Sequence, residues 1–231
     1  MQDIEFNGIL GSTLQIFARD LIEVPAAEPN LEEVKVAGRD GTLYRADGTY
    51  KAKTIQVALN YIGPEERWND RWRLAKQWLS ARNTILKLSD DSAFFYKITY
   101  VSVDSNERTT ARIGNFAAKF VTLDGLQYLV DGRMEYPSKD VEWNPYIECH
   151  PVYKIEADGM CTLNVNGNVM TANVAENLTI DTDRMIAYRS DGTLSNTKVS
   201  GNYEDLYLKP GENKIEFTGG TLAVVPNWRC L

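Results

Sequence analysis

The stretch from Val34 to Tyr61 reads VKVAGRDGTLYRADGTYKAKTIQVALNY, and its last nine residues decide the fold class. From residue 53 onward, apolar and polar side chains alternate. The apolar residues fall on one face of an extended chain: Ile55, Val57, Leu59 and Tyr61. A period of two is typical of a β-strand that is buried on one side only. The stretch therefore predicts a sheet with one apolar face.

Two Asp-Gly pairs, at 40–41 and 47–48, precede this strand, and Gly38 stands just ahead of the first pair. A glycine-rich loop with Asp and Arg nearby could hold a phosphate or a metal ion, or it could serve as turns between strands. A phosphate loop requires the spacing GxxxxGK[ST] and a helix behind it, and the sequence has neither. We therefore interpret both pairs as turns that reverse the chain before the 53–61 strand.

The surrounding sequence predicts further strands and one helix. Residues 95–103 and 111–123 alternate, and Gly114 marks a bulge or a close approach of the backbone. Residues 67–81 instead carry apolar side chains at helical spacing: Trp68, Trp72, Ala75, Trp78 and Leu79. The helix begins either at a cap on Asn69 or one turn earlier, at residues 63–66. We expect its tryptophans to pack across a sheet rather than to form a ligand platform.

A polar stretch with several prolines and glycines separates two predicted domains. We assign residues 1–132 to an N-terminal domain, 133–145 to a linker and 146–231 to a C-terminal domain. The C-terminal domain has short apolar runs divided by glycine-containing turns at 157–159, 166–167, 190–192 and 218–220. This spacing is typical of a β-sandwich or jelly roll. Asn166-Gly167 is the strongest hairpin motif among them.

Composition excludes several classes of function. A net charge of −7 over 231 residues does not provide the basic surface that specific nucleic-acid binding needs. No apolar run reaches the roughly 18 residues of a membrane helix, and the N-terminus does not read as a signal peptide. The three cysteines have no CxxC spacing, so we expect buried, reduced thiols.

The sequence offers no catalytic, cofactor or metal site. The single histidine, His150, adjoins Cys149, and neighbours on a strand point to opposite faces. Asp181 and Asp183 could share a strand face, but no calcium-loop pattern accompanies them. We therefore predict that the chain is not an enzyme and that it carries no cofactor and no metal ion.

Several segments resemble the distal tail (Dit) proteins of siphophages that infect Gram-positive bacteria. The residues between Val36 and Tyr50 match the pattern V-x-G-R-D-G-x-L-x-x-x-D-G-x-Y. Four further segments occur in the same order as in that family: WRLAKQWL at 72–79, LKLSDD at 86–91 followed by Tyr96-Lys97, LKPGEN at 208–213 and PNWR at 226–229. The resemblance spans most of the chain.

The resemblance implies a mainly β structural protein. Its N-terminal β-sandwich-like domain with one α-helix would form a hexameric ring, followed by a galectin-like C-terminal β-sandwich. The ring would be an adaptor in the virion, at the tail tip, joining the major tail tube protein to the tail-associated baseplate hub protein. In some relatives an arm inserted in the C-terminal domain holds receptor-binding proteins, and here that domain is too short for such an arm.

Two hypotheses concern surfaces. The apolar content and length of the 111–123 strand suggest that Phe116, Phe120 and Leu123 lie near a ring interface or the inner wall of the ring. An alternative function is a carbohydrate-binding module contacting the host cell surface. That function would need exposed aromatic side chains such as Tyr203, Tyr207 or Trp228 to form a platform.

Overall fold

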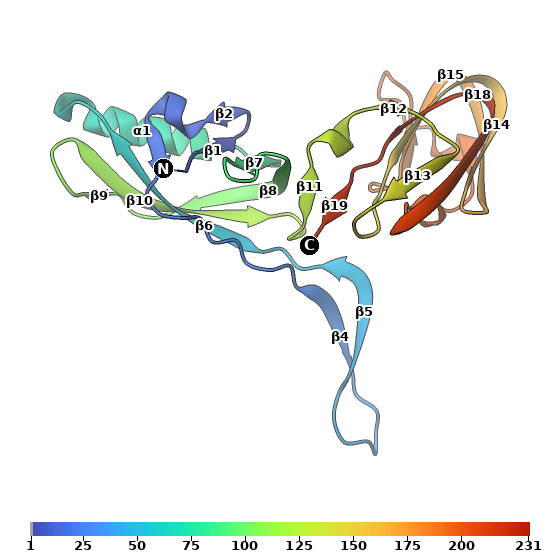
Figure 1. Cartoon of the computed structure of the whole chain (residues 1–231), viewed down its shortest axis with the longest axis horizontal. Helices are drawn as coiled ribbons and strands as arrows, with labels where there is room; N and C mark the ends of the chain where they lie inside the picture. The colour runs from blue at the N-terminus through green and yellow to red at the C-terminus, as the bar shows by residue number, and fades with distance from the viewer. Residues whose placement is uncertain (1) are drawn as a thin grey trace. The chain divides into compact units, whose positions relative to one another are not determined.

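The computed structural model describes residues 2–231 and is mainly β, with one α-helix in that range (Figure 1). Contacts divide the chain into two units, which meet in sequence between Gln127 and Tyr128. In the described residues, no helix is long and apolar enough to cross a membrane.

The first unit is an antiparallel sheet with the strand order β2-β1-β7-β8-β10-β6-β3. Short β9 (Glu107–Arg108) pairs with one end of β10. The strands of the sheet are β1 (Ile4–Phe6), β2 (Ile9–Leu10), β3 (Ile16–Ala18), β6 (Thr54–Ile62), β7 (Thr84–Leu88), β8 (Phe94–Val103) and β10 (Ile113–Thr122). The predicted half-buried strand is β6, whose apolar residues are buried at every second position, as the alternation indicates.

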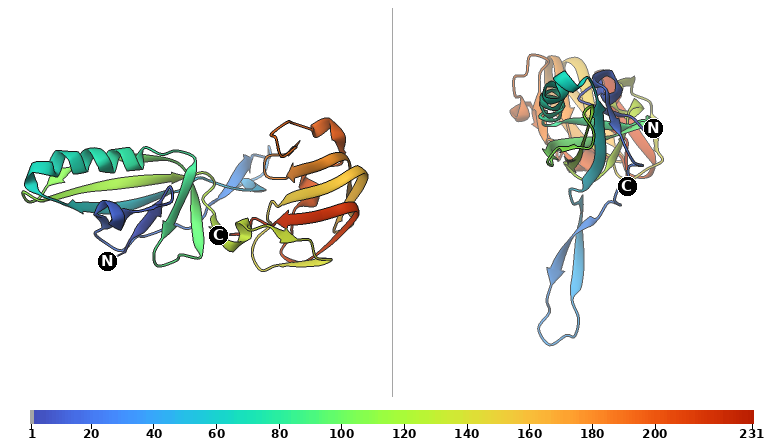
Figure 2. Two further views of the ribbon diagram at one scale, coloured as in Figure 1. Left: turned by 90° about the horizontal axis from the view of Figure 1, so that it is seen from above. Right: turned by 90° about the vertical axis from the view of Figure 1, so that its left-hand side faces the viewer.

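The single helix, α1 (Trp68–Leu79), lies across one face of this sheet (Figure 2). A 3-10 turn at Glu65–Arg67 leads into it, so the helical path begins a turn before Asn69, and no side chain caps α1. Trp78 is buried and donates its indole N–H to the Phe6 carbonyl at 3.0 Å. Trp68 and Trp72 pack partly buried against the same core. The tryptophans thus join helix to sheet, as expected.

The backbone of Gly114 lies close against the ring of Tyr61 on the neighbouring strand β6. A Cβ at this position would lie 2.3 Å from the Tyr61 ring. The buried Tyr61 hydroxyl accepts a hydrogen bond from Asn106 at 2.6 Å, which holds the ring in place. The backbone approach predicted for Gly114 is therefore confirmed, while the bulge in β10 lies elsewhere, between Val121 and Thr122.

A separate hairpin also belongs to this unit. It consists of β4 (Pro29–Val34) and β5 (Leu43–Tyr50), which pair with each other and with no other strand in the described residues (Figure 1). The Lys51 N–H donates to the Glu28 carbonyl at 2.8 Å and closes the foot of the hairpin.

The second unit is a curled antiparallel sheet with the strand order β12-β18-β14-β15-β16. Its strands are β12 (Tyr136–Pro137), β13 (Val141–Asn144), β14 (Val152–Val165), β15 (Asn168–Asp181), β16 (Ile186–Tyr188), β17 (Val199–Ser200) and β18 (Gly211–Val225). β13 adds to β18 and β17 adds to β15. Two short strands near its ends, β11 (Gln127–Leu129) and β19 (Arg229–Cys230), pair with each other.

Three strands of this unit, β14, β15 and β18, are longer than the sequence pattern predicts. Asn166-Gly167 forms the predicted two-residue hairpin turn, with φ of 54° and 90°. The turns predicted at 157–159 and 218–220 are wrong, because both segments lie inside strands, β14 and β18. The register between these two strands shifts at this point, so the glycines form a bulge and not a reversal.

The predicted linker at 133–145 also differs from the structure. Its residues include β12 and β13, which pair with β18 in the second unit. Short strands that pair on one side can be polar and contain proline, so they lack the alternation of a central strand. That is why residues 133–145 read as a linker.

Candidate assembly surface

The β4–β5 hairpin is exposed along its whole length. None of its residues from 29 to 50 is buried. Large apolar side chains nevertheless lie on it, and each is exposed: Leu31, Val34, Val36, Leu43 and Tyr44. Exposed apolar residues gathered on one element are typical of a surface that another molecule covers.

The pairing of the two strands sorts these side chains onto two faces. Leu31 is opposite Ala46 and Glu33 is opposite Tyr44, while Val34 is opposite Leu43. Alternation along a strand puts Leu31, Glu33 and Tyr44 on one face. Tyr44 is 60% exposed although it donates a hydrogen bond to Glu33 at 3.3 Å. This face therefore offers two large apolar side chains around one carboxylate.

The two Asp-Gly pairs have different roles in the hairpin. Asp40-Gly41 lies in the loop that joins the strands, where Gly38 and Gly41 have φ of 79° and 82°. Asp47-Gly48 lies inside β5, where the register with β4 shifts. The prediction that both pairs reverse the chain is thus wrong for the second pair, which forms a bulge.

Hydrogen bonds hold this bulge in shape. Asp47 accepts from the backbone N–H of Thr49 at 2.8 Å and from its hydroxyl at 2.7 Å. The bonds from the Thr49 side chain and backbone hold the pKa of Asp47 below its ordinary value. Asn30 on β4 donates to the same hydroxyl at 2.7 Å, so both strands are tied together at the bulge.

The three interface candidates on the 111–123 strand lie in different environments. Phe116 and Phe120 are buried in the core of the first unit, and Phe120 packs edge-on against Phe6 at 5.3 Å between ring centroids. Leu123 is 57% exposed. A change such as Phe120→Asp would therefore disrupt the core, and only Leu123 has a side chain available to a neighbouring chain.

His150 and its neighbours do not form a catalytic arrangement. The ring accepts a hydrogen bond from Arg229 at Nε2, 2.8 Å away, since arginine can only donate. Its Nδ1 must then carry the proton and donate to the Asp183 carboxylate at 2.9 Å. Burial raises the pKa of the Cys149 thiol to about 11, so this cysteine is not a thiolate at neutral pH. Neither ring nitrogen is free to accept a proton from a nucleophile.

The aromatic residues proposed as a glycan platform are used within the second unit. Tyr207 stacks on the His150 ring, with centroids 4.0 Å apart. Tyr203 and Trp228 pack against the core. These three side chains do not form an exposed platform in the described structure. Over residues 2–231, no group of three or more metal-binding side chains comes together.

The sequence alone does not identify the hairpin as a surface. A pattern that could have revealed it is the set of apolar residues at 31, 34, 36, 43 and 44 on both sides of a loop rich in glycine. These apolar residues occur in short runs that charged residues interrupt. The pattern therefore does not predict strands with an exposed apolar face.

The fold defines a class of chain with two antiparallel β units, the first carrying one helix and an isolated hairpin. Such a chain has a solved counterpart. The structure is similar to the crystal structure of the SPP1 Dit (gp 19.1) protein. That protein is described as a paradigm of the hub adsorption apparatus in phages that infect Gram-positive bacteria.

The similarity covers 97% of each chain with a TM-score of 0.70, at 12% sequence identity. At this identity the likeness is one of fold. No protein-family model matches the chain, and no curated protein matches it.

Proposed function

We propose that this protein is a structural component of a phage tail tip, a homo-hexameric ring adaptor between the tail tube and the baseplate hub. The observation that carries the proposal is the similarity of fold to SPP1 Dit along nearly the whole of both chains. In this proposal the protein resides in the virion, at the tail tip, after synthesis in the host cytoplasm.

The first unit would form the ring, and the second, a galectin-like domain, would lie at its periphery. Closing a ring requires each copy to offer two different surfaces that fit each other. The β4–β5 hairpin supports this role, because its large apolar side chains are exposed and its two strands pair with no other strand of the described residues. The tail tube protein and the hub protein would bind the two faces of the ring.

Electrostatics fit the same role. A net charge of −7 suits a ring through which DNA would have to pass without binding to the wall. In this proposal the protein would act by assembling into a closed ring and would catalyse no reaction.

Negative-stain microscopy of the purified protein tests the proposal. We expect rings of one diameter with peripheral lobes, and a mass by light scattering that corresponds to six copies. Monomers alone at high protein concentration would contradict the proposal.

The alternative function, a carbohydrate-binding module, can be tested on the same preparation. A groove of about 630 Å³ beside strands β14, β15 and β18 is lined by one aromatic residue, Tyr188, and by both polar and apolar side chains. Lys154, in this groove, is already paired with Glu135 at 2.5 Å. We expect no glycan-array signal from the whole chain, and binding that Tyr188→Ala abolishes would favour the alternative.

A further inference from the structure

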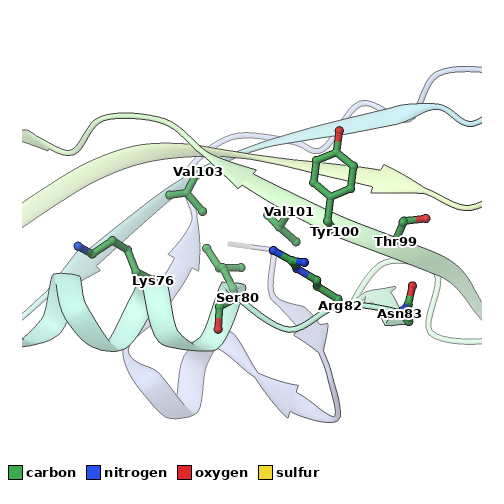
Figure 3. A pocket seen from close by; sticks show the side chains of 9 residues that line it. Lys76, Ser80, Arg82, Asn83, Thr99, Tyr100, Val101 and Val103 are labelled. Atoms are coloured by element: carbon green, nitrogen blue, oxygen red, sulfur yellow. The ribbon is translucent and has the colours of Figure 1, made fainter.

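A groove of about 730 Å³ lies in the first unit, between the end of α1 and strand β8 (Figure 3). The groove is separate from the hairpin, and one residue of the core, Leu79, lines it. Its residues come from the last turn of α1, the segment after it and β8: Lys76, Leu79, Ser80, Arg82, Asn83, Thr99, Tyr100, Val101 and Val103.

One side of the groove is an open strand edge. β7 pairs with β8 only as far as Thr84, which is opposite Ile98. Beyond that point β8 continues to Val103 and pairs with β10 on its other side alone. Between Tyr100 and Val103, every second backbone N–H and C=O therefore points away from β10, toward the groove. Such an edge is a template for another strand.

The other side of the groove is cationic. Its lining contains Lys76 and Arg82 and no acidic residue. Both side chains are exposed, and Arg82 has neither an ion pair nor a hydrogen bond with the rest of the described chain. Val101 and Val103 are partly buried and complete an apolar floor. A matching strand would be apolar and acidic.

We propose that this groove receives strand β4 of a second copy of the chain, which adds to the open edge of β8. This inference rests on the proposed ring assembly and names the surface that the hairpin would occupy. β4 pairs with β5 on one edge only, so its outer edge is available to a further strand.

Charge selects β4 over β5 as the added strand. β4 reads PNLEEV, with two acids and no base, whereas β5 carries Arg45. Alternation puts Leu31 with Glu33 on one face of β4, and Glu32 with Val34 on the other. Whichever face turns toward α1, it brings one carboxylate to the cations and one apolar side chain to the valine floor.

Charge reversal tests the pairing in the whole protein. We expect Lys76→Glu/Arg82→Glu and Glu32→Lys/Glu33→Lys each to raise the concentration for half-maximal assembly by about tenfold or more, because like charges would then face each other. Combining all four substitutions restores attraction, and we expect it to restore assembly. Lys198→Glu/Lys209→Glu is the matched control, since both lysines are exposed and lie in the second unit. Circular dichroism verifies that each variant is folded.

Cross-linking separates this inference from the ring itself. A Glu32→Cys protein and a Glu33→Cys protein, each mixed with an Arg82→Cys protein, probe the two faces of β4. One of the two mixtures should form a disulfide-linked heterodimer on oxidation, and neither protein should do so when it is mixed with Lys198→Cys. Rings without this cross-link, or rings unaffected by the charge reversals, would overturn the inference while the proposed function stands. The cross-link in dimers or open filaments would support the inference and contradict the closed ring. Absence of both rings and cross-link would overturn both.

Discussion

Strand β10 and the β4–β5 hairpin are both rich in apolar residues, but these residues are buried in β10 and exposed in the hairpin. In β10, Phe116 and Phe120 are buried beneath α1, so the chain covers its own apolar surface. In the hairpin, Leu31 and Tyr44 remain 48% and 60% exposed. The apolar content of a strand therefore does not identify an interface. The informative residues are those that the folded chain leaves uncovered.

The largest effect should come from β10. Phe120→Ala removes a fully buried ring, and we expect a loss of about 3–5 kcal/mol in the free energy of unfolding. Urea denaturation followed by fluorescence measures it. Leu123→Ala, on an exposed side chain next to the strand, is the control and should change stability by about 0.5 kcal/mol or less. A loss below about 1 kcal/mol for Phe120→Ala would contradict the core position.

A smaller effect is expected where β10 meets β6. Gly114→Ala would place a methyl group against the Tyr61 ring, and overpacking of this kind costs about 1–3 kcal/mol. Thermal or urea unfolding gives the value. Gly63→Ala is a suitable comparison, because the atoms nearest to its added Cβ belong to the flexible Arg71 side chain. Equal stability of the two variants would show that the Tyr61 ring moves aside without cost.

The smallest effect on stability should come from the hairpin. We expect Leu31→Ser/Tyr44→Ser to change the free energy of unfolding of the monomer by about 0.5 kcal/mol or less, because both residues are exposed. The same variant should fail to form rings in negative stain. If it unfolds far more readily than the parent, the hairpin packs within its own chain and the comparison with β10 fails.

The elements that sequence predicts well are those whose pattern reports burial directly. β6 and α1 were predicted because alternation and helical spacing follow from having one apolar face. Asn166-Gly167 was predicted because few residues tolerate positive φ at both turn positions. The mainly β class follows from these same local patterns.

The turns that the sequence predicts wrongly depend on pairing between distant strands. Glycines at 157–159 and 218–220 suit a turn, but they also suit a bulge between two crowded strands. A Cβ on Gly220 would lie 2.3 Å from the Glu156 carbonyl oxygen, which only the pairing of β14 with β18 makes apparent. Long-range pairing is absent from local sequence, and so is the choice between a covered and an uncovered apolar strand. The candidate assembly surface could not be predicted for that reason.

The bulge at Asp47-Gly48 has a consequence for how the hairpin tolerates changes in length. Two successive pairs of opposite residues flank the bulge: Pro29 with Tyr50, and Leu31 with Ala46. From one pair to the next, β5 advances by four residues and β4 by only two. The two additional residues are an even number, so side chains keep their faces on both sides of the bulge. Deleting one residue there would exchange the two faces over the rest of β5, whereas deleting two would leave them in phase. An insertion or deletion of an odd number of residues at this point would therefore exchange the side chains on the two faces of the hairpin, and one of an even number would not.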